Sequence, residues 1–177
     1  MNQPRIEMNR LELVAGTPEM VRAEMQDPEK FSRLLDAALP TSWPPQFHDL
    51  ETMAYSLEKL ELGADQLGWW CWYSVRSEGT GVNRLVVGIG GFKGRPDETG
   101  SVELGYSVVE DHQNLGFATE AVRGLVNWAT SQPEVKEIIA ETLPDLGASI
   151  RVLEKNGFVF VGAGSEEGVI RYRLMRD

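Results

Sequence analysis

The spacing of apolar residues changes twice along this chain of 177 residues, and that change constrains the fold more than any other feature. Apolar side chains recur at intervals of three and four within residues 18–62, which is typical of helices. Residues 69–109 instead contain three β-rich stretches separated by turns. Beyond residue 117, helical and strand stretches alternate. This order predicts an α+β protein with a mixed sheet that contains an antiparallel meander.

The bounds of the expected elements follow from this spacing and from capping and breaker residues. Thr17-Pro18 and Asp27-Pro28 each combine a capping side chain with a proline suited to a first helical turn, so each begins a helix. We expect helices over 18–25, 28–38, 50–62, 117–130 and 148–156. We expect strands over 10–14, 69–75, 85–92, 101–109, 137–143, 158–163 and 169–175, with turns over 77–83 and 94–100. Because no internal repeat divides the chain, we interpret residues 1–177 as a single domain.

Charge and composition narrow the class of partner. The formal net charge is −10. The sequence has no basic cluster of the kind that nucleic acids require, so we expect no nucleic-acid partner. An acidic surface suits a cationic ligand such as an amine. The single cysteine, Cys71, fits a reducing cytoplasm and is interpreted as packed rather than nucleophilic. No apolar run approaches the roughly 20 residues of a membrane span, so we expect a cytoplasmic protein with no membrane partner.

One segment, VVEDHQNLGFAT at Val108–Thr119, combines a strand end, a short polar loop and a helix start. The first amides of a helix have no intrahelical partner and lie at the positive end of its dipole, so an anion binds there readily. Gly116 allows the backbone to approach a ligand closely, and Ala118 is small. A diphosphate is the expected occupant. Taken alone, the pattern QxxGxA also fits an ordinary turn.

The surrounding residues favour the first interpretation. The stretch ELGYSVVEDHQNLGFATEAVRGLVNWA resembles motif A of the GNAT superfamily of N-acetyltransferases, with its signature at Gln113, Gly116 and Ala118. The later stretch ETLPDLGASIRVLEKNGFVFVG resembles the second signature of that superfamily. Both are most similar to the RimJ/RimL-type branch (ribosomal-protein-alanine N-acetyltransferase-like). The resemblance implies a mostly antiparallel central sheet with helices on both faces. It also implies a splayed parallel strand pair, 101–109 and 137–143, that forms a cofactor cleft.

The resemblance also implies a cofactor and a reaction. Acetyl-CoA would be the acyl donor, with no metal, and a primary amine of a protein N-terminus or small molecule would attack the thioester directly. The oxyanion would meet a strand amide near Val108. We expect a monomer or homodimer. The residues expected to bind the cofactor are Ser107, Val108 and Val109 along the pantetheine arm, and Gln113, Asn114, Leu115, Gly116, Phe117, Ala118 and Thr119 around the pyrophosphate.

Three residues are candidates for proton transfer. Glu103, on the strand face opposite Val102, Leu104, Tyr106 and Val108, and Glu110, at the strand end, are candidate bases, although either also fits a solvated carboxylate. Glu103 is preferred, because a carboxylate within a strand is harder to explain by loop solvation. Ser149 is the candidate donor to the leaving thiolate, or a helix cap.

Two residues depart from the commoner family pattern. Leu153 stands where many members have a tyrosine, and Leu146 stands where an asparagine is common. These departures keep a second function open, a non-catalytic acyl-CoA-binding module. Trp43 is interpreted either as part of an acceptor pocket or as a packed loop residue. His48 and His112 are too isolated for a metal site.

Overall fold

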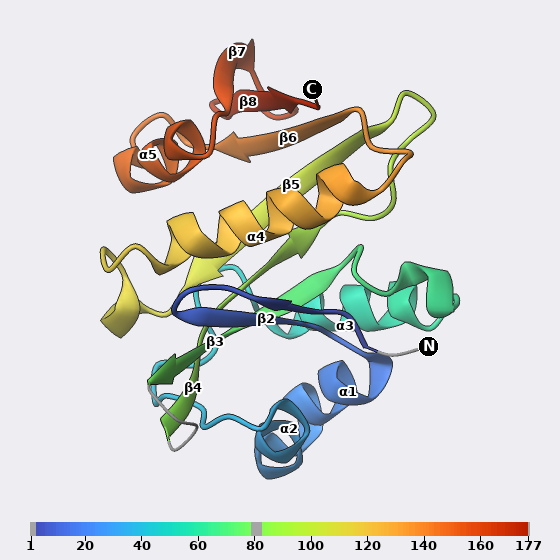
Figure 1. Ribbon diagram of the computed structural model, residues 1–177, viewed down its shortest axis with the longest axis vertical. Helices are drawn as coiled ribbons and strands as arrows, with labels where there is room; N and C mark the ends of the chain where they lie inside the picture. Colours follow the sequence, from blue (N-terminus) through green and yellow to red (C-terminus); the bar gives the residue numbers. More distant parts are fainter. Residues whose placement is uncertain (1–2, 79–82, 177) are drawn as a thin grey trace.

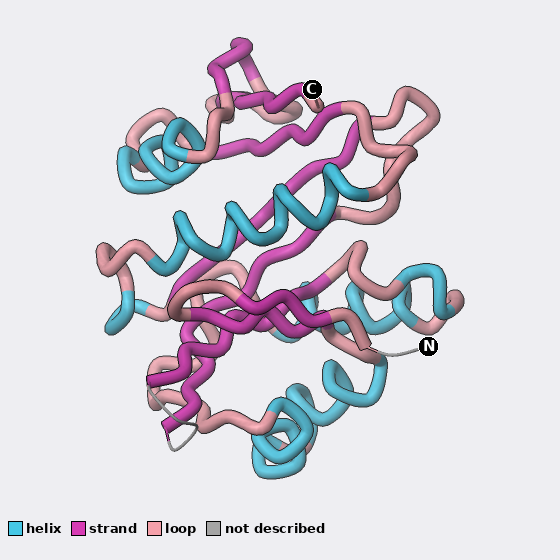
Figure 2. The backbone as a smooth tube through the Cα atoms, viewed as in Figure 1, coloured by secondary structure: helices cyan, strands magenta, loops and turns pink. Residues whose placement is uncertain are grey.

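The computed structural model describes residues 3–78 and 83–176 and contains one eight-stranded sheet (Figures 1 and 2). The strand order is β1-β2-β3-β4-β5-β6-β8-β7. Neighbouring strands are antiparallel except for β5 and β6, which are parallel. The strands are β1 (Arg5–Glu7), β2 (Leu11–Ala15), β3 (Cys71–Glu78), β4 (Asn83–Phe92), β5 (Ser101–Val108), β6 (Glu137–Thr142), β7 (Val159–Ala163) and β8 (Ile170–Met175). The expected mixed, mostly antiparallel sheet is confirmed.

Helices cover both faces of this sheet, as expected (Figure 1). One face packs against α1 (Pro18–Gln26), α2 (Pro28–Leu35) and α3 (Leu50–Leu60), and the other against α4 (Phe117–Ser131) and α5 (Gly147–Lys155). Two short 3-10 turns, η1 (Ala64–Gln66) and η2 (Glu110–His112), lie between the longer elements. Among the described residues, no helix is long and apolar enough to cross a bilayer.

Capping side chains fix where the first helices begin. Thr17 and Asp27 accept hydrogen bonds from the backbone three residues ahead, at 3.2 and 3.0 Å, which confirms the two predicted helix starts. The predicted helix over 28–38 is too long, because Asp36 adopts a left-handed conformation with φ of 52° and ends α2 at Leu35. Ala38 instead pairs with Leu85 of β4, which attaches the loop after α2 to the sheet.

The meander also differs from the prediction at its ends. The strand predicted over 69–75 begins at Cys71, and it extends to Glu78. Residues 77, 78 and 83 of the predicted turn over 77–83 therefore belong to β3 and β4, and residues 79–82 lie outside the described residues. Strand β1 was not predicted, because three residues are too few to show an alternating pattern. Both faces of β3 are covered, since Trp72 belongs to the core under α4 and Tyr73 to the core under α1–α3.

Candidate active site

The parallel strands β5 and β6 separate at one end. Their pairing begins at Ser101↔Glu137 and ends at Leu104↔Ala140, although both strands continue further. The peptide groups of Glu103 and Val109 face β4, because Glu103 O accepts from Lys93 N at 2.9 Å and Val109 N donates to Val87 O at 3.0 Å. Peptide groups alternate along a strand, so those of Tyr106 and Val108 face the opening. The splayed parallel pair inferred from the sequence is therefore present.

The expected pyrophosphate loop lies between β5 and α4. Asn114 and Gly116 both have positive φ, of 61° and 85°, so the chain turns tightly before the helix. Gly116 is the N-cap of α4 and supplies no capping side chain. The first intrahelical bond is donated by Glu120 N to Gly116 O. The amides of Phe117, Ala118 and Thr119 are consequently available to an anion.

The residues predicted to bind the cofactor lie together around this loop. Val109 and the side chain of Phe117 are buried and anchor the loop, whereas Asn114 and Leu115 are exposed. Gln113 is also exposed, and its Nε2 donates to Val108 O at 3.1 Å. That bond caps a carbonyl that faces the opening, and it holds the strand end against the loop.

A cation that the sequence did not reveal lies beside the loop. Arg10, just before β2, donates from Nη1 to Leu115 O at 2.9 Å. Its Nε lies 2.9 Å from Glu120 Oε2, and its Cζ lies 4.7 Å from the centroid of the Phe117 ring. A Cβ atom placed on Gly116 would lie 3.1 Å from Arg10 Nη2. The guanidinium therefore contacts the loop on either side of its glycine.

Arg10 also neutralises a buried carboxylate at the start of α4. Glu120 is 8% exposed and accepts from the backbone N–H groups of Arg10 and Leu11 at 2.6 and 3.2 Å. A carboxylate in the first helical turn stabilises the helix, but on its own it would repel a diphosphate. Arg10 and Glu120 are 110 positions apart in the sequence, so no local sequence pattern could predict their ion pair.

A second contact holds the first turn of α4 from the side of α5. Asn156, at the C-terminal end of α5, donates from Nδ2 to Thr119 O at 3.2 Å and to Val152 O at 2.8 Å. Asn156 belongs to the second sequence signature, although no role was inferred for it. The two signatures thus meet at the loop.

The predicted donor Ser149 has a partner in β5. The hydroxyl oxygens of Tyr106 and Ser149 lie 3.0 Å apart, and the Tyr106 hydroxyl also donates to Ser149 O at 3.1 Å. Burial raises the pKa of Tyr106 to about 12, against the opposing effect of the hydrogen bond with Ser149. The phenol is therefore protonated at neutral pH. The sequence analysis grouped Tyr106 with the apolar residues of its strand and predicted no role for its hydroxyl. Leu153, at the position where many family members have a tyrosine, is buried in the core.

The two predicted bases lie at different points, one within β5 and one just beyond its end. Glu103 belongs to the part of β5 that is still paired with β6, and its carboxylate forms an ion pair with Lys93. Ser107, which is predicted to lie along the pantetheine arm, is four residues further along β5. Glu103 is therefore about 13 Å from it along the strand. Glu110 is exposed at the start of η2, directly beyond the end of β5.

A third carboxylate lies at the point where β6 leaves β5. Glu141 follows the last paired residue of β6 and shares a sheet face with Glu103, because Glu103 pairs with Ile139. It accepts from Arg171 at 2.7 and 2.8 Å and from Ser165 at 2.6 and 2.8 Å. Burial would raise the pKa of Glu141, but the hydrogen bonds from Ser165 and Arg171 outweigh it and lower that pKa. Glu141 is thus held ionised.

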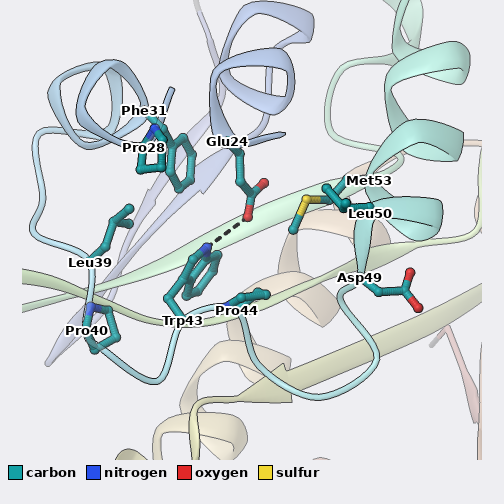
Figure 3. Close-up of a pocket in the computed structure, with 10 residues that line it drawn as sticks. All are labelled: Glu24, Pro28, Phe31, Leu39, Pro40, Trp43, Pro44, Asp49, Leu50 and Met53. Carbon is teal, nitrogen blue, oxygen red and sulfur yellow. Dashed lines mark hydrogen bonds between the residues drawn. The ribbon is translucent and has the colours of Figure 1, made fainter. Parts of the chain in front are cut away.

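The remaining candidates are placed as follows. Trp43 lines a cavity among α1, α2, α3 and the loop that joins α2 to α3 (Figure 3), and it also packs against Phe31 and Tyr73. Cys71 is buried, and burial raises the pKa of its thiol to about 12, so it is a packed residue. Within residues 3–78 and 83–176, no group of three metal-ligating side chains is found.

With this geometry in place, comparison with known proteins shows the family. The family model of the acetyltransferase (GNAT) domain matches residues 10–159. The chain belongs to the GNAT acetyltransferase family. One relative of this GNAT protein is the uncharacterized N-acetyltransferase YjdG of Bacillus subtilis (strain 168). The two are 32% identical over 155 residues, which are 87% of this chain and 89% of YjdG.

Solved structures share the fold of this GNAT enzyme. RimL, a ribosomal L7/L12 α-N-protein acetyltransferase in complex with coenzyme A, has a TM-score of 0.67 at 19% identity, covering 98% of this chain and 99% of that one. The ribosomal-protein-S5-alanine acetyltransferase of Vibrio fischeri has a TM-score of 0.67 at 16% identity, covering 98% and 97%. This chain is therefore a GNAT-type N-acetyltransferase, and the opening between β5 and β6 lies in the fold that it shares with them.

Proposed function

We propose that this GNAT enzyme transfers the acetyl group of acetyl-CoA to a primary amine by direct attack in a ternary complex. The observation that carries the proposal is the separation of β5 and β6 beyond Leu104 and Ala140, next to the uncapped start of α4. In the reaction, a bond forms between the amine nitrogen and the acetyl carbon, and the carbon–sulfur bond breaks. One proton leaves the amine and another reaches the sulfur of CoA.

The proposal assigns residues of the chain to each part of the cofactor. The diphosphate would take the amides of residues 113–119, with the positive charge of Arg10 close by. The pantetheine arm would follow Ser107, Val108 and Val109, and the Val108 amide would stabilise the oxyanion. The complex of RimL with coenzyme A supports the cofactor assignment. The proposed reaction involves no metal.

Proton transfer is assigned to side chains on both sides of the opening. Ser149, joined to the protonated phenol of Tyr106, would donate to the leaving thiolate. Glu110 and Glu103 remain the proposed bases. The exposed carboxylate of Glu110, directly beyond the unpaired end of β5, is the better placed of the two. Glu141, held by Arg171 and Ser165, is assigned to positioning β6 at the opening.

The acceptor is proposed to be a protein N-terminus or a small-molecule amine. The likeness of both sequence signatures to the RimJ/RimL-type branch supports an N-terminus, as do the activities for which RimL and the Vibrio fischeri enzyme are named. A single-domain chain, a monomeric or homodimeric state and a cytoplasmic location, which fits the lone Cys71, belong to the same proposal.

One pair of measurements tests the proposal. Release of CoA thiol would be followed over a panel of amines and N-terminal peptides, and thermal stabilisation by CoA would be measured in parallel. We expect both, because a ligand that binds only the native state raises its stability. Stabilisation without turnover on any acceptor would support the acyl-CoA-binding module instead. If CoA does not stabilise the protein, the loop assignment is wrong.

A further inference from the structure

The backbone around Gly105, in the middle of β5, does not require a glycine. Its φ lies outside the left-handed region, and a Cβ atom placed on it would meet no heavy atom of the described chain within 4 Å, its sequence neighbours aside. Glycine weakens a strand, because it loses more backbone freedom on folding than other residues and has no side chain to pack. An exposed glycine that the strand does not need indicates a point where a ligand approaches the backbone closely.

The other glycines of the described strands have structural explanations. Gly162, in β7, has a left-handed φ of 124°. Three more lie in β4, where an added Cβ atom would lie between 1.7 and 2.9 Å from its nearest neighbour: Gly88, Gly90 and Gly91. Gly91 is the partner of Gly105 across the sheet, so the contrast lies within one pair. Among the glycines of these strands, only Gly105 has neither a left-handed φ nor a close neighbour.

Gly105 lies on the half of the sheet that α1–α3 leave uncovered. Among the described residues, the buried core beneath those helices takes its strand residues from β2, β3 and β4 alone. Ile89 of β4 belongs to that core and pairs with Ser107 of β5. Alternate residues of a strand share a face, so Gly105 lies on the same face as Ser107. Ser107 is half-buried and Gly105 is exposed, whereas the opposite face of β5 packs under α4 and α5.

This open position adjoins the point where β5 and β6 separate, because Gly105 is the first residue of β5 beyond the paired part. It lies two residues, or about 7 Å, before Ser107, where the pantetheine arm is proposed to lie. Tyr106, between the two, faces the other way and contacts Ser149, the proposed donor to the thiolate. The leaving group is thus assigned to the side of α5, and the side that carries Gly105 is left for the attacking amine.

The charged side chains beside Gly105 are already paired. Glu103, on the same face of β5, forms an ion pair with Lys93. Glu141, on the same face of β6, accepts from Arg171 at 2.7 and 2.8 Å. The open face therefore offers an acceptor little uncompensated charge at this point. What the missing side chain of Gly105 supplies is space.

We propose that the carbon atom bearing the acceptor's amine lies against the backbone of Gly105, and that this residue determines which amines the enzyme takes. This inference rests on the proposed N-acetyltransferase function. The space over Gly105 holds a substituent on that carbon, as in the N-terminal residue of a peptide or a branched amine. A side chain at position 105 would fill the same space. It would exclude substituted amines first and leave acetyl-CoA binding unchanged, because the residues assigned to the cofactor lie at 107–119.

Two acceptors test whether this space is used. Valinamide carries an isopropyl group on the carbon that bears the amine, and glycinamide carries none. In Gly105→Ala, we expect kcat/KM to fall at least tenfold for valinamide and less than threefold for glycinamide, at saturating acetyl-CoA. KM for acetyl-CoA should change less than twofold. Equal losses for the two amines would overturn the proposal, and so would an equal rise in KM for acetyl-CoA, because the space would then hold the acyl donor.

A matched pair of variants separates this role from a loss of folding. Gly105→Val should keep or raise the midpoint of thermal unfolding, because valine favours strands and an added Cβ atom has room there. It should nevertheless lower kcat/KM for valinamide at least 100-fold. Ser101→Val places the same side chain on the same face of β5, within the part paired with β6, and should match the parent enzyme. Equal losses in both variants would contradict a specific role for Gly105.

Failure of this inference can be distinguished from failure of the proposed function. If the parent enzyme acetylates other amines but not valinamide, or if Gly105→Val keeps the parental kcat/KM, only the role of Gly105 is wrong. If no amine is acetylated, the proposed function fails. Binding of valinamide in the presence of CoA is then measured by saturation-transfer NMR on the full chain. Binding that Gly105→Val abolishes and Ser101→Val retains supports the assignment, and binding that both retain or the absence of binding overturns it.

Discussion

The hydroxyl oxygens of Tyr106 and Ser149 lie 3.0 Å apart, which joins β5 to the first turn of α5 across the end where β5 and β6 separate. The two side chains come from the two sequence signatures, 43 positions apart. Their contact places a protonated phenol and a serine hydroxyl where the thiolate of CoA is proposed to leave. Tyr106 thereby brings a phenol to the site in a chain whose last helix carries Leu153 in place of the commoner tyrosine.

We expect Tyr106→Phe and Ser149→Ala each to lower kcat by about 10²-fold, the lower end of the usual range for general acid–base catalysis. KM for acetyl-CoA should change less than twofold. The double variant should lose little more than either single one, because the two hydroxyls act as a unit. Since burial raises the pKa of Tyr106 to about 12, its phenol should still donate at pH 10. Parental kcat in Tyr106→Phe would contradict this role.

Arg10 should act through cofactor binding. Arg10→Gln removes the charge beside Gly116 and leaves the buried carboxylate of Glu120 uncompensated. We expect KM for acetyl-CoA to rise about tenfold, which corresponds to about 1.4 kcal/mol, with kcat nearly unchanged. Arg22→Gln, which breaks an exposed pair with Glu61, is the control and should have no effect. The double variant Arg10→Gln/Glu120→Gln should recover part of the loss; no recovery would argue against the electrostatic explanation.

Gly116→Glu should weaken CoA binding by tenfold or more. The new side chain would extend toward Arg10 Nη2 and place a negative charge at the proposed diphosphate site. Gly168→Glu is a matched control, because Gly168 has a similar φ of 81° but lies in the turn between β7 and β8. Both variants carry the strain of a left-handed non-glycine residue, about 1–2 kcal/mol. Thermal stabilisation by CoA should be lost only in Gly116→Glu, and its retention there would show that the loop is misassigned.

The base is tested by pH rescue. Glu110→Gln should lower kcat/KM for the amine at least tenfold at pH 7, and by less than threefold near pH 10, where more of the amine is already deprotonated in solution. Glu103→Gln should cost less, since its carboxylate is committed to Lys93 in the paired part of β5. If Glu110→Gln lowers kcat/KM by the same factor at every pH, proton abstraction by Glu110 is excluded. If Glu103→Gln lowers kcat/KM more than Glu110→Gln does, Glu103 is the base.

Local patterns predicted most elements, because helix caps and apolar spacing act over a few consecutive residues. Thr17 and Asp27 begin their helices as predicted, since each caps an amide three residues away. Asp36 shows the limit of such patterns. Its left-handed conformation shortens α2, and Ala38 pairs with β4 instead, a contact across 47 positions that apolar spacing does not register.

The α+β class, the family resemblance and the candidate loop at residues 113–119 could be predicted from the sequence, because they depend on the order and identity of neighbouring residues. Which distant side chains meet became visible only in the folded chain. The pairing of Arg10 with Glu120, the contact of Tyr106 with Ser149 and the cavity around Trp43 all depend on strand order and register. Those are set by packing of the whole sheet between its two helical layers, and no local stretch of sequence specifies them.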